Sequence, residues 1–138
     1  MADPVEPDPS AAGCPLVRSA IDAYNRRDLA GLRELMTDDV ELRPPVSALT
    51  GRAYRGHAGI EEWLHDLDES FSSAQIVPLE LRDLGTRVLA LTEFLVEGHE
   101  SHVPLGSELG LICDLSHGRI ASWLGYFSHA DAAAAAES

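Results

Sequence analysis

The chain has 138 residues, of which 45% are hydrophobic and 24% charged, a composition typical of one globular domain with its own core. Acidic residues number 23 against 10 basic ones, and the resulting net charge of −13 at pH 7 disfavours nucleic acid and anionic membranes as partners. Every basic residue is an arginine, which excludes a lysine Schiff base, a lysine general base and the lysine of a phosphate-binding loop.

The ends of the chain are expected to lie outside a single folded domain. Residues 1–10 combine three prolines with three acidic residues and predict a disordered acidic lead-in. Residues 131–138 are mostly alanine without an amphipathic face, which predicts a frayed tail. The domain itself is then expected to span residues 11–130.

Three helices and one short strand are predicted in the first half of the domain. Apolar residues spaced three and four positions apart predict helices over 15–26 and 57–71. Between them, Asp28 is a suitable N-cap for a short second helix. Residues 40–44 then predict a short strand that ends at a pair of prolines, and residues 46–56 predict a loop.

The second half of the domain is predicted to be all strands. Four segments rich in β-formers are separated by turn residues, and they cover 76–84, 87–99, 106–115 and 119–127. Helices first and consecutive strands afterwards are typical of an α+β fold, in which a curved sheet closes over the helices.

The compartment is predicted from the cysteines and from the apolar segments. Cys14 and Cys113 lie far apart in the sequence and do not have the spacing of metal ligands. Two such cysteines fit a reducing compartment, where both stay free, at least as well as an oxidising one, where they would form a disulfide. No apolar run is long enough to span a membrane, and the start lacks the basic segment of a secretory signal. We therefore expect a cytoplasmic protein.

Four short motifs follow one another in the order of these predicted elements. They are Ala23-Tyr24-Asn25-Arg26-Arg27-Asp28-Leu29-Ala30-Gly31-Leu32, Asp38-Asp39-Val40, Tyr54-Arg55-Gly56-His57-Ala58-Gly59-Ile60 and His117-Gly118-Arg119-Ile120. Over residues 14–129 the chain resembles the SnoaL-like (polyketide cyclase-like) branch of the nuclear transport factor 2-like superfamily. The resemblance implies a cone of three helices against a strongly curved mixed or antiparallel sheet, a pocket inside the cone, and a homodimer formed through the sheet.

The resemblance leaves the function open, because the same cone hosts isomerases, polyketide cyclases, epoxide hydrolases, dehydratases and non-catalytic binding proteins. The catalytic groups of the ketosteroid isomerases would fall on Pro44, Ala20, and Gly110 or Leu111, none of which carries an acid, a base or a hydroxyl. The acids of the epoxide-hydrolase-like members would fall within 123–128, which contains neither carboxylate nor arginine. Both activities are disfavoured, whereas proton transfer by a cyclase remains open.

Polar residues near the end of the strand predicted over 87–99 are the candidates for catalysis. Alternation places Glu97 and His99 on the face opposite Phe94. The functional interpretation is either a general base formed by Glu97 or His99, with Tyr24 as a hydrogen-bond donor, or a Glu97–His99 pair that binds a cationic or hydroxylated ligand. The alternative interpretation is a solvated strand face, because structural charges produce the same pattern.

No metal or cofactor is predicted. His99 and His102 suggest a metal site by their spacing, but on a strand these two positions point to opposite faces. Cys113 lies among leucines on an alternating face, which predicts a buried, inert thiol and not a nucleophile.

Aromatic residues and their neighbours are the candidates for ligand binding. The residues expected to face the inside of the implied cone are Tyr24, Leu42, Trp63, Phe71, Trp123, Gly125 and Phe127. Core packing explains each aromatic residue taken alone. Gly125, however, is expected to leave room beside the indole of Trp123, which favours an apolar pocket for a small molecule.

Our leading hypothesis is therefore a domain that binds a small hydrophobic molecule in an apolar, aromatic-lined pocket without the known catalytic sets. The first alternative is an isomerase or cyclase that acts on a polyketide- or terpenoid-like substrate by general acid/base catalysis. The second is a non-catalytic dimeric interaction module. The expected partners are a small hydrophobic molecule and a second copy of the chain, with neither nucleic acid nor membrane.

Overall fold

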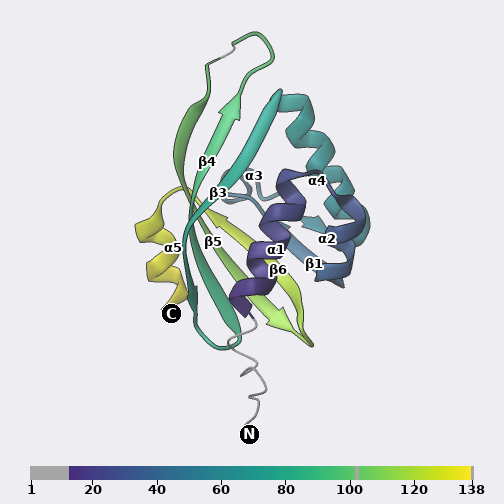
Figure 1. Ribbon diagram of the computed structural model, residues 1–138, viewed down its shortest axis with the longest axis vertical. Helices are drawn as coiled ribbons and strands as arrows, with labels where there is room; N and C mark the ends of the chain where they lie inside the picture. The colour runs from purple at the N-terminus through teal and green to yellow at the C-terminus, as the bar shows by residue number, and fades with distance from the viewer. Residues whose placement is uncertain (1–12, 102, 138) are drawn as a thin grey trace, which may run out of the picture.

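The computed structural model describes residues 13–101 and 103–137, and their elements follow the predicted order (Figure 1). The elements are α1 (Gly13–Asn25), α2 (Leu29–Leu35), β1 (Met36–Arg43), α3 (Ser47–Thr50), β2 (Tyr54–Arg55), α4 (Gly56–Ser70), β3 (Ser73–Asp83), β4 (Arg87–Glu97), β5 (Leu105–Ser116), β6 (Arg119–Tyr126) and α5 (His129–Ala136). The lead-in expected over residues 1–10 lies outside the described residues.

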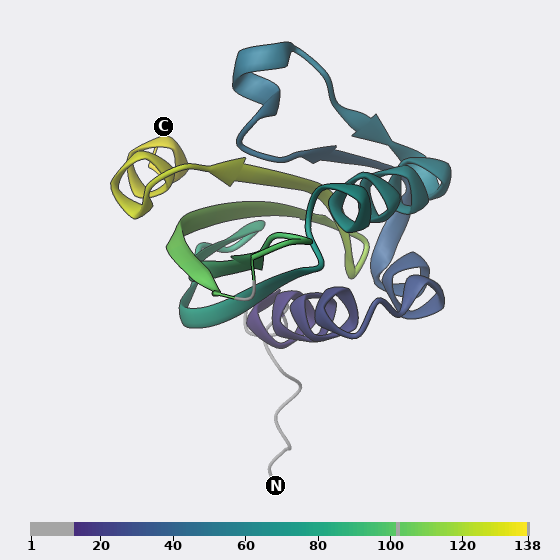
Figure 2. The ribbon, with the colours of Figure 1, turned by 90° about the horizontal axis from the view of Figure 1, so that it is seen from above.

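One mixed sheet organises the domain, with its six strands in the order β2-β1-β6-β5-β4-β3. The β1–β6 pair is parallel and the other pairs are antiparallel. Register shifts interrupt β3 between Pro78 and Glu80 and β5 between Asp114 and Leu115, and such bulges increase strand twist and bending. The sheet curls, with α1, α2 and α4 on its inner face and α5 on its outer face (Figures 1 and 2). The α+β class and the curved sheet are thus confirmed.

Most of the buried residues form one core between the inner face of the sheet and helices α1, α2 and α4. Residues from all these elements are excluded from solvent, among them Val17, Ile21, Leu32, Ile60, Leu111 and Ile120. The N-cap predicted for the second helix is confirmed, because the carboxylate of Asp28 accepts a hydrogen bond from the Gly31 amide at 3.0 Å. None of the helices in the described ranges is long and apolar enough to cross a membrane.

Asn25 at the end of α1 fastens this helix to strand β3. Its amide nitrogen donates to the carbonyl of Ile76, and its amide oxygen accepts from the Ile76 N–H, both at 2.8 Å. Since β3 is the last strand of the sheet, Asn25 satisfies backbone groups that no further strand pairs with.

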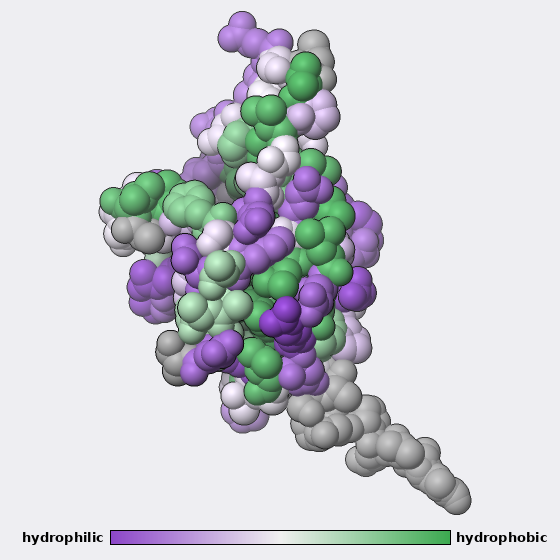
Figure 3. Space-filling view, turned by 90° about the vertical axis from the view of Figure 1, so that its left-hand side faces the viewer, coloured by the Kyte–Doolittle hydropathy of each residue, from purple (hydrophilic) through white to green (hydrophobic). Residues whose placement is uncertain are grey.

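Apart from shifted strand ends, the elements differ from the sequence-based prediction in two places. The predicted 46–56 loop contains helix α3 and strand β2, which pairs with β1. The alanine-rich segment expected as a frayed tail forms helix α5, with Ser128 as its N-cap. Helix α5 covers part of the outer sheet face, the side shown in Figure 3, where hydrophobic and hydrophilic side chains are intermixed. Alanines give no amphipathic pattern because a small side chain suits both sides of such a helix.

Helix α5 approaches the sheet closely only because position 110 in β5 is a glycine. A Cβ at Gly110 would lie 2.3 Å from the Cβ of Ala132 and 3.2 Å from the carbonyl oxygen of Ser128. Gly110→Ala is therefore expected to lower the free energy of unfolding by roughly 1–3 kcal/mol, as overpacking does in cores. Urea denaturation measures this, with Gly98→Ala as the matched control because a Cβ at Gly98 meets nothing within 4 Å. Equal stability of the two variants would contradict the close packing.

Candidate functional site

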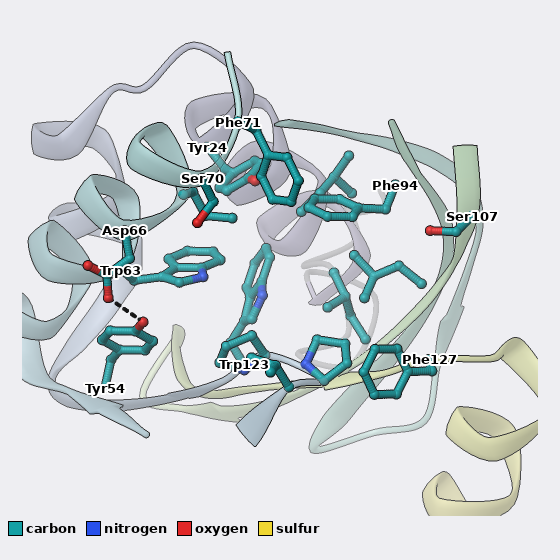
Figure 4. A pocket seen from close by; sticks show the side chains of 17 residues that line it. Tyr24, Tyr54, Trp63, Asp66, Ser70, Phe71, Phe94, Ser107, Trp123 and Phe127 are labelled. Carbon is teal, nitrogen blue, oxygen red and sulfur yellow. Dashed lines mark hydrogen bonds between the residues drawn. The ribbon is translucent and has the colours of Figure 1, made fainter. Parts of the chain in front are cut away.

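A cavity of about 410 Å³ lies between the inner face of the curled sheet and helices α1 and α4 (Figure 4). Seventeen residues line it, and most of them are apolar. The inner faces of β5 and β6 contribute Leu109, Leu111 and Trp123, and the segment after β1 contributes Pro44 and Pro45. A volume of this size accommodates a small organic molecule.

One face of helix α4 forms a wall of the cavity. Trp63, Asp66, Leu67 and Ser70 stand at positions i, i+3, i+4 and i+7, and this spacing places them on one side of an α-helix. Gly59 lets α4 pack tightly against β2, because a Cβ there would lie 3.0 Å from the backbone carbonyl carbon of Tyr54. The helix is thereby held with its indole and carboxylate at the cavity.

Three aromatic side chains stack in series along the cavity. The ring centroids of Tyr24 and Trp63 are 5.1 Å apart, and those of Trp63 and Trp123 are 5.9 Å apart in an edge-on arrangement. Phe71 and Phe94, which also line the cavity, form a second edge-on pair with ring centroids 6.4 Å apart (Figure 4). These distances lie in the range of favourable aromatic pairs, so the aromatic walls stabilise one another.

The hydroxyl of Tyr24 is buried and has no hydrogen-bond partner among the described residues. The guanidinium of Arg27 covers the ring at 4.6 Å and also hydrogen-bonds the Tyr24 carbonyl at 2.8 Å, which fixes the ring's position. Burial raises the pKa of Tyr24 to about 12, with Arg27 opposing the shift. Tyr24 is therefore a neutral hydroxyl at physiological pH, buried on a residue that lines the cavity.

A second polar group at the cavity is the pair formed by Tyr54 and Asp66. The Tyr54 hydroxyl donates to Oδ2 of Asp66 at 2.6 Å, and Nη2 of Arg52 lies 3.6 Å from the same oxygen. Burial, and then the hydrogen bond to Asp66, raise the pKa of Tyr54 to about 12. The pair thus places one carboxylate at the edge of an otherwise apolar cavity.

The structure brings together five of the predicted site residues and separates the others. Tyr24, Trp63, Phe71, Trp123 and Phe127 all line the cavity. The cavity-lining residues do not include Leu42, which is fully buried in the core.

Gly125 does not leave the open space that was expected beside Trp123. A Cβ at Gly125 would lie 2.6 Å from Cδ of Pro45, so the proline ring fills that position. The glycine therefore admits Pro45, which itself lines the cavity, and no sequence pattern predicts this long-range contact.

The two predicted bases lie away from the cavity. Strand alternation puts Glu97 on the face opposite Phe94, and it is Phe94 that lines the cavity. His99 follows β4 in an exposed position, where its Nε2 lies 3.1 Å from the carbonyl oxygen of Glu69. Of the three candidate catalytic residues, only Tyr24 is at the cavity.

Sequence reasoning missed Asp66 and Tyr54 as site residues. Asp66 shares the helical face of Trp63 and Leu67, so a polar position within that apolar stripe was an available signal. Tyr54 lies in a two-residue strand that the sequence pattern does not predict. Among the described residues, no group of three or more His, Cys, Asp or Glu side chains is placed to hold a metal ion.

The buried hydroxyl of Tyr24 predicts a loss of stability in alkaline solution. Its folded-state pKa of about 12 exceeds the ordinary value of 10, so the unfolded chain releases the proton first as the pH rises. The contribution is fully present below about pH 10 and disappears as the pH rises towards about 12. Between pH 8 and pH 11, wild type is expected to lose roughly 1 kcal/mol more than Tyr24→Phe in urea unfolding. Equal losses would contradict the burial of this hydroxyl.

The family model described as "SnoaL-like domain" matches residues 17–123. The chain belongs to the SnoaL-like family. All residues that line the cavity except Phe127 lie within this match. No curated protein matches the sequence significantly.

Solved structures share the fold of this SnoaL-like domain at low sequence identity. An NTF2-like protein of unknown function from Burkholderia pseudomallei K96243 is 20% identical with a TM-score of 0.75, covering 87% of this chain and 93% of that one. TerC, co-crystallised with polyporic acid, is 20% identical with a TM-score of 0.76, covering 95% and 100%. A putative polyketide cyclase from Xanthomonas campestris pv. campestris is 20% identical with a TM-score of 0.72, covering 90% and 96%.

Proposed function

We propose that this SnoaL-like domain binds a small, mainly apolar molecule that contains a ring, in the cavity between the sheet and helices α1 and α4. The observation that carries the proposal is the combination of a cavity of about 410 Å³ with a buried Tyr24 hydroxyl that has no partner among the described residues. Transfer of an apolar ligand from water to the apolar walls lowers the free energy, and a hydrogen bond to the Tyr24 hydroxyl would orient the ligand. The co-crystallisation of TerC with polyporic acid supports including quinones among the candidates.

A thermal-shift screen tests the proposal. The panel contains steroids, aromatic polyketides, quinones, terpenoid epoxides and fatty acids, and a ligand that binds the folded state raises the midpoint by linkage. The double variant Leu109→Phe/Leu111→Phe adds volume at two buried lining positions and should abolish the shift. Leu105→Phe on the same strand is the matched control, because Leu105 is exposed outside the cavity. Silence across the panel would contradict the proposal.

A second candidate function is a cofactor-independent isomerase or cyclase that acts on such a ligand. What favours it is that the cavity holds both a carboxylate, on Asp66, and a separate hydroxyl, on Tyr24. Proton abstraction needs a base within hydrogen-bond reach and a donor for the developing oxyanion. In this version Asp66 replaces Glu97 as the base. Conversion of a bound panel compound, followed by mass spectrometry, should be lost in Asp66→Asn and kept in Glu97→Gln.

We also propose that the sheet surface forms a homodimer, and the alternative of a non-catalytic interaction module would use the same surface. Helix α5 occupies part of the outer face, and on the side in Figure 3 hydrophobic side chains lie among hydrophilic ones. The exposed apolar side chains Leu79 and Leu105 lie on β3 and β5 and supply a physical reason for self-association. Light scattering should report about twice the 14.9 kDa of the chain, and a monomer at micromolar concentration would contradict the dimer.

A further inference from the structure

The charge contributed by the cavity-lining side chains is negative. Asp66 is the one charged residue among the described residues that line it, and no arginine or histidine does so. Oδ2 of Asp66 accepts from Tyr54, whereas Oδ1 has no hydrogen-bond partner within the described part of the chain. An acceptor at the edge of an apolar space is thus left free for a donor on a ligand.

Arg52, which lies close to Asp66, does not make the charge at the cavity positive. Arg52 has an exposed side chain, donates to Glu62 at 2.9 Å, and forms an ion pair with Asp66 in which its Nη2 lies 3.6 Å from Oδ2, the oxygen already bound by Tyr54. The overall charge of −13 acts in the same direction, because it concentrates cations and repels anions near the surface. An anionic group on a ligand would find no partner among the lining residues.

The aromatic walls next to Asp66 favour the same type of ligand. The indole of Trp63 lies next to Asp66, and the indole of Trp123 packs against Trp63 farther inside the cavity (Figure 4). Aromatic faces carry negative charge density, and tryptophan binds a cation most strongly. Carboxylate and indoles together form the usual surroundings of a positively charged nitrogen.

We propose that the ligand carries a protonated amine on an apolar body, with the amine beside the half-exposed Asp66 carboxylate at the edge of the cavity and the body among the aromatic walls. This inference rests on the proposed function, since it names the chemical class of the molecule that the cavity binds. The amine would donate to the free carboxylate oxygen in a charge-assisted hydrogen bond, and its remaining surface would contact the indoles.

Three probes with one apolar body test the inference, namely 4-phenylbutan-1-amine, 4-phenylbutan-1-ol and 4-phenylbutanoate. Isothermal titration calorimetry at pH 7 should give the tightest binding for the amine, roughly tenfold weaker binding for the alcohol, and the weakest binding for the carboxylate. Asp66→Asn keeps an acceptor for the Tyr54 hydroxyl and should cost the amine about tenfold in affinity while changing the alcohol less than about twofold. Glu61→Gln is the matched control, because it removes one charge from an exposed position of the same helix outside the cavity.

The outcomes separate this inference from the proposed function. Binding of the alcohol as tightly as the amine, or tightest binding of the carboxylate, overturns the amine and leaves the apolar ligand site in place. An equal loss of amine affinity in Asp66→Asn and Glu61→Gln also overturns it, because the effect would then come from net charge alone. Absence of binding by all three probes overturns the inference, and together with a silent thermal-shift panel it overturns the proposed function as well.

Discussion

Replacing Trp123 with alanine is expected to lower the free energy of unfolding by roughly 3–5 kcal/mol and to abolish ligand binding, the largest double effect in the domain. The indole is 2% exposed and packs edge-on against Trp63, so its removal leaves a void in the centre of the core. The void also joins the existing cavity and removes one of its aromatic walls. Urea denaturation measures the first effect, and thermal shift with a panel ligand measures the second.

Trp123→Phe is the control that distinguishes loss of the aromatic wall from general disruption of the structure by any substitution at this position. Phenylalanine keeps an aromatic wall, so this variant should retain more than half of the stability that alanine loses and should still bind. A stability loss below about 1 kcal/mol in Trp123→Ala, or unchanged ligand binding, would contradict the position of this residue at the junction of core and cavity.

Asn25→Ala is the second substitution with a large expected effect, a loss of roughly 2–4 kcal/mol in the free energy of unfolding. The amide of Asn25 makes two hydrogen bonds of 2.8 Å to the backbone of Ile76, a residue that is 1% exposed. Alanine would leave a buried N–H and a buried carbonyl without partners at the edge of the sheet. Because Ile76 lines the cavity, looser attachment of α1 to β3 should also weaken ligand binding.

Urea denaturation and amide hydrogen exchange check this second prediction. Exchange of the Ile76 amide should become faster in Asn25→Ala before that of amides in the central strand β5. Asp22→Ala is the matched control on the exposed face of the same helix, with an expected loss of at most about 1 kcal/mol. Equal stability of the two variants would show that Asn25 does not fasten the helix to the sheet.

The fold was largely predictable because its signals are local. Helical spacing in α1 and α4, the N-cap Asp28 and the turns between strands each specify structure over a few residues. What escaped prediction depends on contacts between distant parts of the chain. Helix α5 is stabilised by packing on Gly110, and the alanines themselves carry no pattern that predicts this.

The cavity was predictable in its aromatic residues and not in its polar ones. Trp63 and Phe71 follow a helical period, and Trp123 with Phe127 follow a strand period, so their shared face could be inferred. Which strand face lines the cavity depends on how the sheet curves, and the structure places Phe94 on that face and Glu97 on the opposite one. The hydrogen bond between Tyr54 and Asp66 depends on a contact between the two-residue strand β2 and helix α4. No sequence pattern predicts this contact.

The measurement that tests the central claim most directly is a titration of intrinsic tryptophan fluorescence. The chain has two tryptophans, Trp63 and Trp123, and both line the cavity, so occupation of the cavity must change their surroundings. We predict a saturable change with one 4-phenylbutan-1-amine or 4-phenylbutan-1-ol per chain, retained in Leu105→Phe and lost in Leu109→Phe/Leu111→Phe. A signal that does not saturate, or one that persists unchanged in the cavity-filled variant, would contradict a ligand site in this cavity.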